Sequence, residues 1–359
     1  MTTGELVTAH PFDPVVGHKR TLAMLSSEPA TPAHAYLFVG PEGVGKGTVA
    51  RAFAALLVCP TAGAHDGECS SCRRAASGNH PDVNIVEPEG RTMLTVGQAR
   101  TTMARATLAP VESVRKVFVF DEAGVMSEGA ANALLKTLEE PNATTAFILV
   151  TDSEEDLPAT LGSRCRIIHF GRVEETEVVA ALEHAGVDAE QATEAARLGA
   201  GRPGLALGLA TRPEVASFRR AWLAVPGRVS ARPGDSFVLA EELLDGLEPL
   251  IAGVEEHALE TEGNATKEKR DRDNHRAKRE LLVSGVEILA SWYLDAAAVQ
   301  FGATPRNRDL DLTDLTEVSP GVAVASAERV LDAAVELRAN QRPTLVLAAL
   351  FTDLAMRTT

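Results

Sequence analysis

The sequence predicts an α/β domain built on a parallel sheet, followed by a small helical domain and a larger all-helical domain. Up to about residue 172, short apolar segments alternate with segments of helical character, a pattern typical of a parallel sheet covered on both faces. Beyond Arg172 the strand signal fades and helix-favouring Ala and Leu are plentiful. A glycine-rich turn joins the first apolar segment to the first helix, which is the context of a phosphate-binding loop.

The predicted elements of the first domain follow in chain order. Five apolar segments are predicted strands: 35–40, 83–86, 117–120, 146–151 and 166–170. Three segments are predicted helices: 47–58, 96–108 and 128–140, of which the last is ended by Pro141. A cysteine-bearing insertion, 59–75, separates the first helix from the second strand.

The remainder of the chain is predicted to be helical. Residues 174–209 favour short helices around the turn 199–204, and helices are expected from residue 214 onward, with a loop over 305–320. The mixed-charge run 261–280 is expected to form a solvated helix with pairs of opposite charge. Contact with nucleic acid is the alternative role for this run.

Composition limits the class of protein. The chain has 359 residues, of which 45% are apolar and 24% charged, as in ordinary soluble globular proteins. A net charge of −15 argues against broad, non-specific binding of nucleic acid. We find no apolar run of about 18 residues that would predict a membrane span, and residues 1–13 lack the basic-then-apolar order of a signal peptide. We therefore expect a cytoplasmic protein whose four cysteines are thiols or metal ligands rather than disulfides.

A candidate nucleotide-binding loop follows the first predicted strand. The segment has the spacing Gly-x-x-x-x-Gly-Lys, with Gly40, Gly43, Gly45 and Lys46 as its candidate binding residues. Backbone N–H groups of such a turn, at the start of a helix, bind phosphate through oriented dipoles, and the lysine adds a cation at the β- and γ-phosphates. A plain glycine-rich turn without a ligand is the alternative.

The residue after this lysine departs from the pattern. Ser or Thr at this place supplies a hydroxyl to the nucleotide's magnesium, but the chain has Gly47. Thr48 comes one residue later, and on a helix it points about 100° away. We therefore expect binding of ATP with Mg²⁺ to be weak or absent.

Two acids end the third predicted strand, Asp121 and Glu122. In phosphoryl-transfer enzymes the first acid of such a pair orients magnesium and the second can polarise the attacking water. The alternative is a solvated strand end, which the phosphate-binding loop some 75 residues upstream makes less attractive.

The tripeptide Ser163-Arg164-Cys165 precedes the last predicted strand. Arg164 is a candidate to stabilise transition-state charge on a nucleotide bound by a neighbouring subunit. An ordinary surface arginine is the alternative. Cys165 is interpreted as a small buried apolar residue.

The other three cysteines suggest a zinc site. Cys69 and Cys72 have the Cys-x-x-Cys spacing that can hold one face of a tetrahedral ion, and Cys59 lies ten residues earlier. A closed structural site needs a fourth ligand, for which His65 and His80 are the nearby candidates. Three reduced thiols without metal are the alternative.

Several of these motifs, in this order and spacing, resemble the bacterial clamp-loader family of AAA+ proteins. The resemblance covers Val15 to about Leu209 and rests on a series of segments. They are His34-Ala-Tyr-Leu-Phe-Val-Gly, the phosphate-binding loop, the cysteine module, Asp121-Glu122-Ala123, Ala131-Asn-Ala-Leu-Leu-Lys-Thr-Leu-Glu-Glu-Pro141 and Ser163-Arg164-Cys165. Arg338-Ala-Asn-Gln-Arg-Pro-Thr-Leu-Val-Leu is a looser match near the end.

The resemblance implies an architecture and further site residues. It implies a RecA-like AAA+ domain over 1–172, a helical lid over 173–212, and a helical collar over 213–359 that joins subunits into a five-membered ring. Val15 and Val16 match the family's adenine-side segment, and Thr151 matches its sensor position at the end of a strand.

Two glycines distinguish between the family's stator, the delta-prime subunits, and its ATP-hydrolysing motor, the gamma/tau subunits. The motor type keeps Ser or Thr where this chain has Gly47, and it carries a phosphate-sensing arginine where this chain has Gly204. Arg202 lies two residues away from that sensor place. The chain therefore resembles delta-prime more closely, and the motor type remains the alternative.

The resemblance to delta-prime implies a role in DNA replication. Such a subunit of the DNA-directed DNA polymerase III holoenzyme has no catalysis of its own. It joins gamma/tau and delta subunits in a hetero-pentamer that loads the sliding clamp onto primed DNA, without contact with a membrane. Arg164 is then expected to act in trans on ATP bound by the adjacent motor subunit.

The chain departs from the family pattern in its metal site. The fourth cysteine of the family zinc module is replaced by Ala75. Zinc is therefore retained only where His65, His80 or water completes the ligand set. The intact Gly-x-x-x-x-Gly-Lys loop, in contrast, favours residual nucleotide binding.

Overall fold

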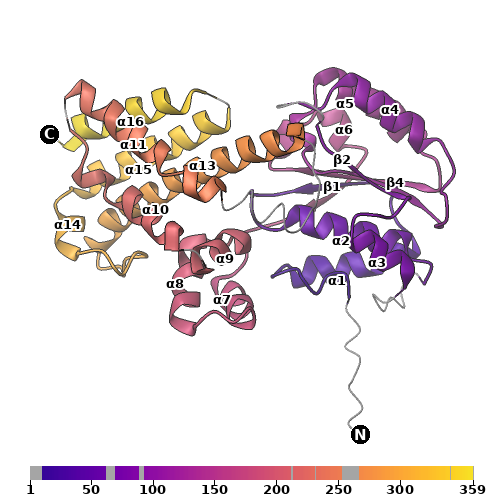
Figure 1. Ribbon diagram of the computed structural model, residues 1–359, viewed down its shortest axis with the longest axis horizontal. Helices are drawn as coiled ribbons and strands as arrows, with labels where there is room; N and C mark the ends of the chain where they lie inside the picture. The colour runs from indigo at the N-terminus through magenta and orange to yellow at the C-terminus, as the bar shows by residue number, and fades with distance from the viewer. Residues whose placement is uncertain are drawn as a thin grey trace, which may run out of the picture. The chain divides into compact units, whose positions relative to one another are not determined.

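A computed structural model describes residues 10–61, 69–88, 93–211, 213–230, 232–252, 267–339 and 341–358 (Figure 1). The chain divides into two compact units, Met1–Ala210 and Thr211–Thr359. The division into a sheet domain, a lid and a collar remains a prediction, because the lid helices belong to the first compact unit. Three ion pairs, Lys46–Asp152, Arg51–Asp121 and Arg164–Glu139, lie within the first unit. The cluster of three cysteines lies in the same unit.

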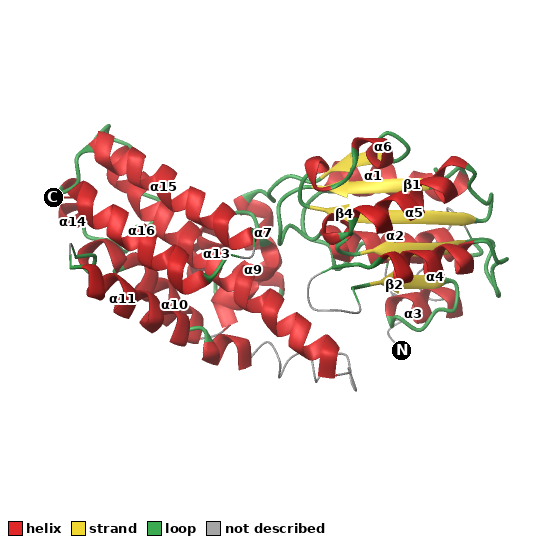
Figure 2. Ribbon diagram, turned by 90° about the horizontal axis from the view of Figure 1, so that it is seen from above, coloured by secondary structure: helices red, strands yellow, loops and turns green. Residues whose placement is uncertain are grey.

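The first unit is built on one parallel sheet whose strand order is β2-β3-β4-β1-β5. Its strands are β1 (Ala35–Val39), β2 (Val83–Val86), β3 (Lys116–Phe120), β4 (Thr145–Thr151) and β5 (Arg166–His169). Every neighbouring pair is parallel, and β1 lies between β4 and β5 (Figure 2). All five predicted strands are therefore confirmed, and so is the predicted α/β class with a parallel sheet.

Helices cover both faces of this sheet. They are α1 (Lys19–Ser27), α2 (Lys46–Val58), α3 (Ser70–Ala76), α4 (Val96–Ala106), α5 (Glu128–Glu139) and α6 (Ala159–Gly162). The three helices predicted here are confirmed. The sequence analysis missed α1, α3 and α6, of which α3 lies in the cysteine-bearing insertion and α6 is a single turn.

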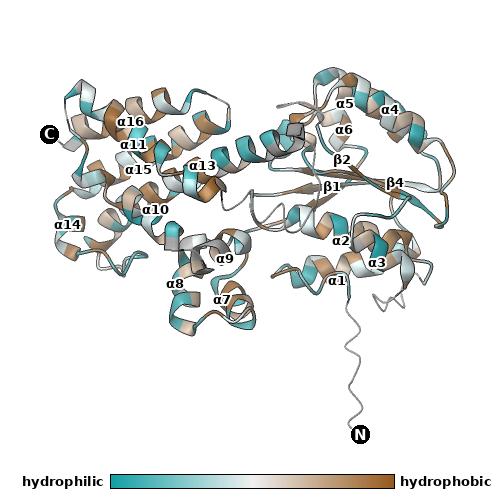
Figure 3. Ribbon diagram, in the orientation of Figure 1, coloured by the Kyte–Doolittle hydropathy of each residue, from teal (hydrophilic) through white to brown (hydrophobic). Residues whose placement is uncertain are grey.

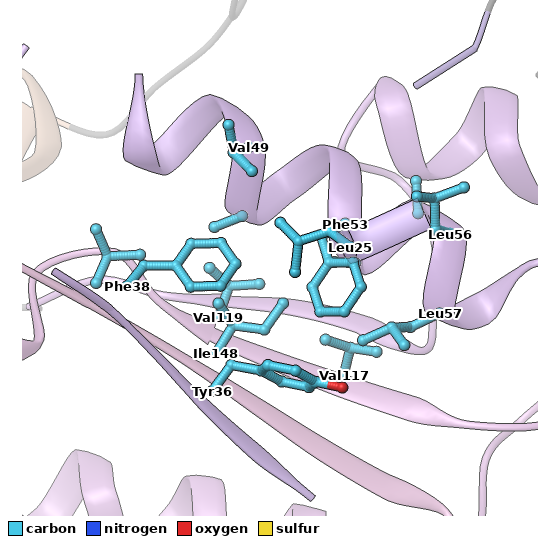
Figure 4. Close-up of a cluster of buried hydrophobic side chains, with 14 of the residues drawn as sticks. Leu25, Tyr36, Phe38, Val49, Phe53, Leu56, Leu57, Val117, Val119 and Ile148 are labelled. Carbon is cyan, nitrogen blue, oxygen red and sulfur yellow. The ribbon is translucent and has the colours of Figure 1, made fainter. Parts of the chain in front are cut away.

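Alternation along β1 explains how one strand serves two cores. Tyr36 and Phe38 point into the cluster beneath α1 and α2, where Phe53 and Leu25 also lie (Figure 4). Ala35, Leu37 and Val39 belong to the cluster beneath α4 and α5 on the other face. Successive side chains of a strand point to opposite faces, so a strand buried on both sides is apolar throughout. Figure 3 accordingly shows the strands as hydrophobic.

Three short helices follow the sheet: α7 (Glu175–His184), α8 (Ala189–Gly199) and α9 (Pro203–Thr211). Their shared cluster includes Val178, Leu182 and Ala206, and it receives Val173 and Val16 from outside these helices. Helices are therefore present where the small helical domain was predicted, and its separation as a domain stays a prediction. Val16 connects these helices to the segment that precedes α1.

The second unit is all helical over the described residues. It contains α10 (Pro213–Leu223), α11 (Pro233–Asp245), α13 (Lys267–Val299), α14 (Leu312–Thr316), α15 (Pro320–Arg338) and α16 (Pro343–Thr358). The predicted loop 305–320 was wrong in part, since α14 lies inside it. Asp311 caps this helix by accepting a hydrogen bond from the backbone N–H of Thr313.

The charged run 261–280 forms the start of α13 from Lys267 onward, and its first residues, 261–266, lie outside the described part. Lys278 pairs at 3.4 Å with Glu248, which lies outside the run, so the predicted pairs within the helix stay a prediction. Farther along α13, Ala277–Val299 is long and apolar enough to cross a membrane by length and composition. This corrects the sequence-based expectation of no such segment. Since 72% of its most apolar window is buried inside the protein, it has the burial of a core helix.

Gly285 of α13 is a packing requirement in the second unit. A Cβ added there would lie 2.1 Å from Cε2 of Trp222, whose ring is fully buried. A methyl group in this place forces the indole or the helix to move, because a packed core does not absorb extra volume.

We expect Gly285→Ala to lower the free energy of unfolding of the second unit by about 1–3 kcal/mol, despite the better helix propensity of Ala. Both tryptophans of the chain, Trp222 and Trp292, lie in this unit. Urea unfolding followed by tryptophan fluorescence therefore reports on it directly. Gly321→Ala in α15 is the matched control, since no described atom lies within 4 Å of its added Cβ. Equal stability of the two variants would contradict the packing argument.

Candidate nucleotide cleft and cysteine cluster

The phosphate-binding loop begins where β1 ends. Gly40 has to be glycine, because a Cβ there would lie 2.1 Å from the carbonyl oxygen of Phe170. Phe170 also donates its backbone N–H to Val39 O at 2.7 Å, which fixes the loop entrance beside β5. Gly45 has φ 100° and stands as the N-cap of α2, whose first residue is Lys46. The predicted strand–turn–helix context is therefore present.

Lys46 is buried and hydrogen-bonded within the chain. Its Nζ donates to Gly40 O at 2.6 Å, to Pro41 O at 2.8 Å and to Asp152 Oδ1 at 2.9 Å, and the side chain is only 6% exposed. Asp152 was missed by the sequence analysis. Its position after β4, which pairs with β1 in register Val39↔Thr151, was the signal that could have found it.

Asp121 lies directly beside Gly47. A Cβ added to Gly47 would be 2.7 Å from Asp121 Oδ1, so the carboxylate occupies the space that a Ser or Thr side chain needs. The other carboxylate oxygen, Oδ2, accepts a hydrogen bond from Arg51 Nη2 at 2.6 Å. Arg51, one turn along α2 from Gly47, was not predicted as a site residue.

Magnesium does not fit these residues. An ion beside the β- and γ-phosphates needs the hydroxyl that Gly47 lacks, and it needs an acid such as Asp121. That acid is paired with a guanidinium, which repels a divalent cation. Thr48 is exposed on the outer side of α2, so its hydroxyl does not replace the missing ligand.

Two further predicted residues lie at neighbouring strand ends. Thr151 is buried, and its Oγ1 donates to Asp156 Oδ2 at 2.7 Å and to Ser153 O at 3.2 Å. Thr151 therefore anchors the turn after β4. Glu122 is half-buried and begins the 3₁₀ turn after β3, where its carbonyl accepts a hydrogen bond from Val125 N.

The segment Val15–His18 connects the loop to the lid. His18 donates from Nε2 to Val44 O at 2.9 Å. Val15 packs against the core beneath α2, and Val16 packs against the lid cluster. Gly17 has φ 76° and approaches Val173 so closely that its added Cβ would lie 2.6 Å from Cγ1. The predicted adenine-side residues are therefore brought to the loop and the lid together.

Arg202 of the lid lies against the loop. A Cβ added to Gly43 would be 3.1 Å from Arg202 Cδ, and Arg202 donates from Nε to Gly199 O at 3.2 Å. Gly204, at the place of the missing sensor arginine, is exposed, and no described atom lies within 4 Å of its added Cβ. The lid therefore presents the stem of Arg202, rather than a residue at position 204, to the loop.

Arg164 lies away from the phosphate-binding loop, after α6. Its Nη2 pairs with Glu139 Oε1 at 2.7 Å, and its Nη1 donates to Thr160 O at 2.7 Å. The arginine side chain is 34% exposed and Glu139 is 50% exposed. Half-exposed pairs of this kind contribute less than about 1 kcal/mol, so Arg164 can exchange this partner for another anion. Cys165 next to it is packed against the core under α4 and α5.

The three remaining predicted metal ligands come together. Cys59 Sγ lies 3.9 Å from Cys69 Sγ, which lies 3.1 Å from Cys72 Sγ. All three sulfurs lie within 4.8 Å of one another. Sulfurs around a tetrahedral zinc, with Zn–S bonds of about 2.3 Å, are about 3.8 Å apart. The three thiols therefore fit three corners of such a site.

The cluster has no fourth cysteine among the described residues, and Ala75, at the family's fourth-cysteine position, packs into the apolar core. His65 lies outside the described residues. His80 is buried, but its Nε2 is engaged by Ser71 Oγ at 2.8 Å and Glu112 Oε1 at 3.3 Å. Among the described residues the metal-type group consists of the three cysteines, so His80 does not belong to it.

The thiols differ in acidity. Burial raises the pKa of Cys72 far above its usual range, and hydrogen bonds with Cys69 and Cys59 raise it further. Burial also opposes ionisation of Cys69, but hydrogen bonds from Cys72 and Cys59 lower its pKa on balance. Burial alone raises the pKa of Cys165 to about 12. Cys165 is therefore an inert thiol, as its interpretation as an apolar residue predicted.

Known proteins match the part of the chain that carries the cleft. Residues 17–174 match the family model described as DNA polymerase III, delta subunit. The delta-prime subunit of DNA polymerase III from Pseudomonas aeruginosa is 40% identical over 139 residues, which are 38% of this chain and 42% of that protein. Over these residues the chain is therefore similar to delta-prime subunits of DNA polymerase III. The delta-prime subunit from Escherichia coli is 37% identical over 180 residues, 49% of this chain and 54% of that protein.

Motor-type subunits are similar too. The tau subunit of DNA polymerase III from Bacillus subtilis is 35% identical over 184 residues, 50% of this chain and 32% of that protein. The chain spans about half or less of the length of these delta-prime and tau relatives. Similarity over the first half therefore does not distinguish a delta-prime subunit from a tau subunit, and that choice depends on the residues around the phosphate-binding loop.

We expect the purified chain to bind one zinc ion through the cysteine cluster, and Cys69→Ser to abolish this binding, because it removes one of the only three clustered sulfurs among the described residues. Zinc per chain is measured by elemental analysis after dialysis. Cys165→Ser is the control and should keep its metal, since Cys165 lies outside the cluster. Equal zinc content in the two variants would contradict the assignment.

Proposed function

We propose that this chain is a delta-prime-type stator of the DNA polymerase III clamp loader. The observation that carries the proposal is Asp121, whose carboxylate fills the space beside Gly47 and pairs with Arg51. A cleft arranged in this way does not hold the magnesium that phosphoryl transfer uses. The chain therefore keeps the frame of an ATPase without turning over ATP itself.

The proposed stator contributes Arg164 to the ATP site of an adjacent gamma/tau subunit. Arg164 is partly exposed, lies at the end of a short helix and is held by an acid that is itself half exposed. A guanidinium in this state is available to the charge that develops on a transferred phosphoryl group, which is how a trans-acting arginine accelerates hydrolysis.

The proposed partners follow from the same role. They are gamma/tau and delta subunits in a hetero-pentamer, joined by the helical second unit, together with the sliding clamp and primed DNA contacted by the assembly. The relatives are named as subunits of DNA polymerase III, which supports work at the replisome in the cytoplasm. We propose zinc as a structural ion that ties the insertion to α2 through Cys59.

The alternative is the ATP-hydrolysing motor. The intact loop from Gly40 to Lys46 and the 35% identity to a tau subunit favour it. Turnover by the isolated chain, stimulated by primed DNA and abolished by Lys46→Ala, would decide for the motor.

We expect Arg164→Ala to fold normally and to slow ATP hydrolysis by the reconstituted clamp loader. The neighbouring site loses a transition-state cation, which can be worth about 10³-fold at that one site. Steady-state phosphate release by the complex measures the effect. Arg100→Ala is the control, since Arg100 is an exposed arginine of α4. Unchanged turnover in the Arg164 variant would remove the assignment.

We expect Gly47→Thr alone to leave the isolated chain without ATPase activity. The new side chain supplies a hydroxyl, but it displaces an Asp121 carboxylate that Arg51 already holds, and Gly204 leaves the lid without its sensor arginine. Phosphate release at saturating ATP and Mg²⁺ is the measurement. Robust turnover in this single variant would show that the cleft lacks only one ligand.

A further inference from the structure

Magnesium does not fit this cleft, but the Arg51 guanidinium supplies a positive charge beside Asp121. We propose that the loop binds the phosphates of a nucleotide without a divalent cation, with the Arg51 guanidinium in the role that magnesium has in active relatives. The inference rests on the proposed function only in treating the cleft as non-hydrolysing.

The position of Arg51 supports this assignment. It lies one helical turn after Gly47, on the same side of α2, because residues four apart in a helix are neighbours. Its Nη2 reaches Asp121 Oδ2 at 2.6 Å, while its side chain remains 51% exposed. Asp121 in contrast is only 12% exposed. The Arg51 guanidinium is therefore solvent-exposed while it pairs with the nearly buried acid at the end of β3.

Gly47 makes this pair possible. The Asp121 Oδ1 atom is 2.7 Å from the place of a Cβ at position 47. With any larger residue there, the carboxylate would have to turn away from α2. The loss of the magnesium hydroxyl and the formation of the Arg51–Asp121 pair are therefore two consequences of a single glycine.

The groups that bind phosphate are retained. Gly43 and Gly45 have φ 78° and 100°, so the loop adopts turns that L-residues disfavour, at the N-terminus of a 13-residue helix. Lys46 Nζ is held by two loop carbonyls and by Asp152, which is 55% exposed. A phosphate group offers Lys46 a stronger partner than these carbonyls do, and Asp152 can turn into water.

The charges already present in the cleft disfavour binding of a divalent cation. In an active cleft Mg²⁺ offsets the charge of the phosphates and of the strand-end acid. Here Arg51 already offsets Asp121 and Lys46 faces the phosphates. A divalent cation entering this cleft meets a guanidinium in place of a hydroxyl and an acid that is already paired. We therefore expect the affinity for nucleotide to be the same with Mg²⁺ and with a chelator.

Binding of ADP to the full-length purified chain, followed by isothermal titration calorimetry, tests the inference. Each titration is run once with excess Mg²⁺ and once with EDTA. Wild-type protein should give equal affinities, and Lys46→Ala should lose binding under both conditions. Arg51→Gln removes the internal cation, so its affinity in EDTA should fall and Mg²⁺ should recover roughly threefold to fivefold, the size of one screened charge contact.

A second substitution separates electrostatics from damage to the fold. In the double variant Arg51→Gln with Asp121→Asn, no acid remains to attract the ion, and the Mg²⁺ effect should vanish again. Arg105→Gln is the matched control, since Arg105 is an exposed arginine on α4, which packs on the other face of the sheet. It should behave as wild type does in both titrations.

Three results would overturn the inference: no detectable binding of ADP by the wild-type chain, binding that Mg²⁺ strengthens in the wild type, or an Arg51→Gln variant that behaves like Arg105→Gln. These results are independent of the stator proposal, which fails on turnover of the complex carrying Arg164→Ala. Either proposal can therefore fail while the other stands.

Discussion

The parallel pairing of β1 with β4, and of β4 with β3, is the constraint on which the cleft depends. Because these strands run the same way, their carboxyl ends meet at one edge of the sheet. Lys46 meets Asp152 there, and Asp121 meets Gly47 and Arg51, although up to 106 residues of sequence separate the partners. A fold in which one of these strands ran antiparallel would scatter the same residues.

Within this frame the charged groups of the cleft pair with one another. The Lys46 ammonium has the Asp152 carboxylate, and the Asp121 carboxylate has the Arg51 guanidinium. Buried charges without partners are costly, so a cleft that works without a metal needs internal counter-ions if it is to keep its lysine and its acid. Asp152 and Arg51 both remain half exposed, which keeps each pair exchangeable rather than locked.

The elements that have strong local signals could be predicted from sequence, and the partners of each charge could not. The apolar run of β1 followed by the glycine loop predicted the strand, the turn and α2. The Cys-x-x-Cys spacing predicted that Cys59, Cys69 and Cys72 would come together, as they do. Arg51 and Asp152 could not be predicted as site residues, because each acts through an ion-pair partner that is distant in sequence and is brought near by the sheet. The helix α14 inside the predicted loop escaped because its five residues show no clear period.

The phosphate-binding loop and Arg164 lie in different parts of the first unit, and their charged groups are held differently. The phosphate loop contains a lysine held by its own carbonyls, and its acid is neutralised. Arg164, in contrast, is held only by Glu139, which is half exposed, and by a backbone carbonyl at the end of a single helical turn. In the stator that we propose, Asp152 and Arg51 supply the counter-ions of the cleft from within the chain, while Arg164 exchanges Glu139 for the charge on a neighbour's nucleotide. This arrangement supports the proposed stator, a subunit that contributes to a neighbour's chemistry without turning over ATP itself.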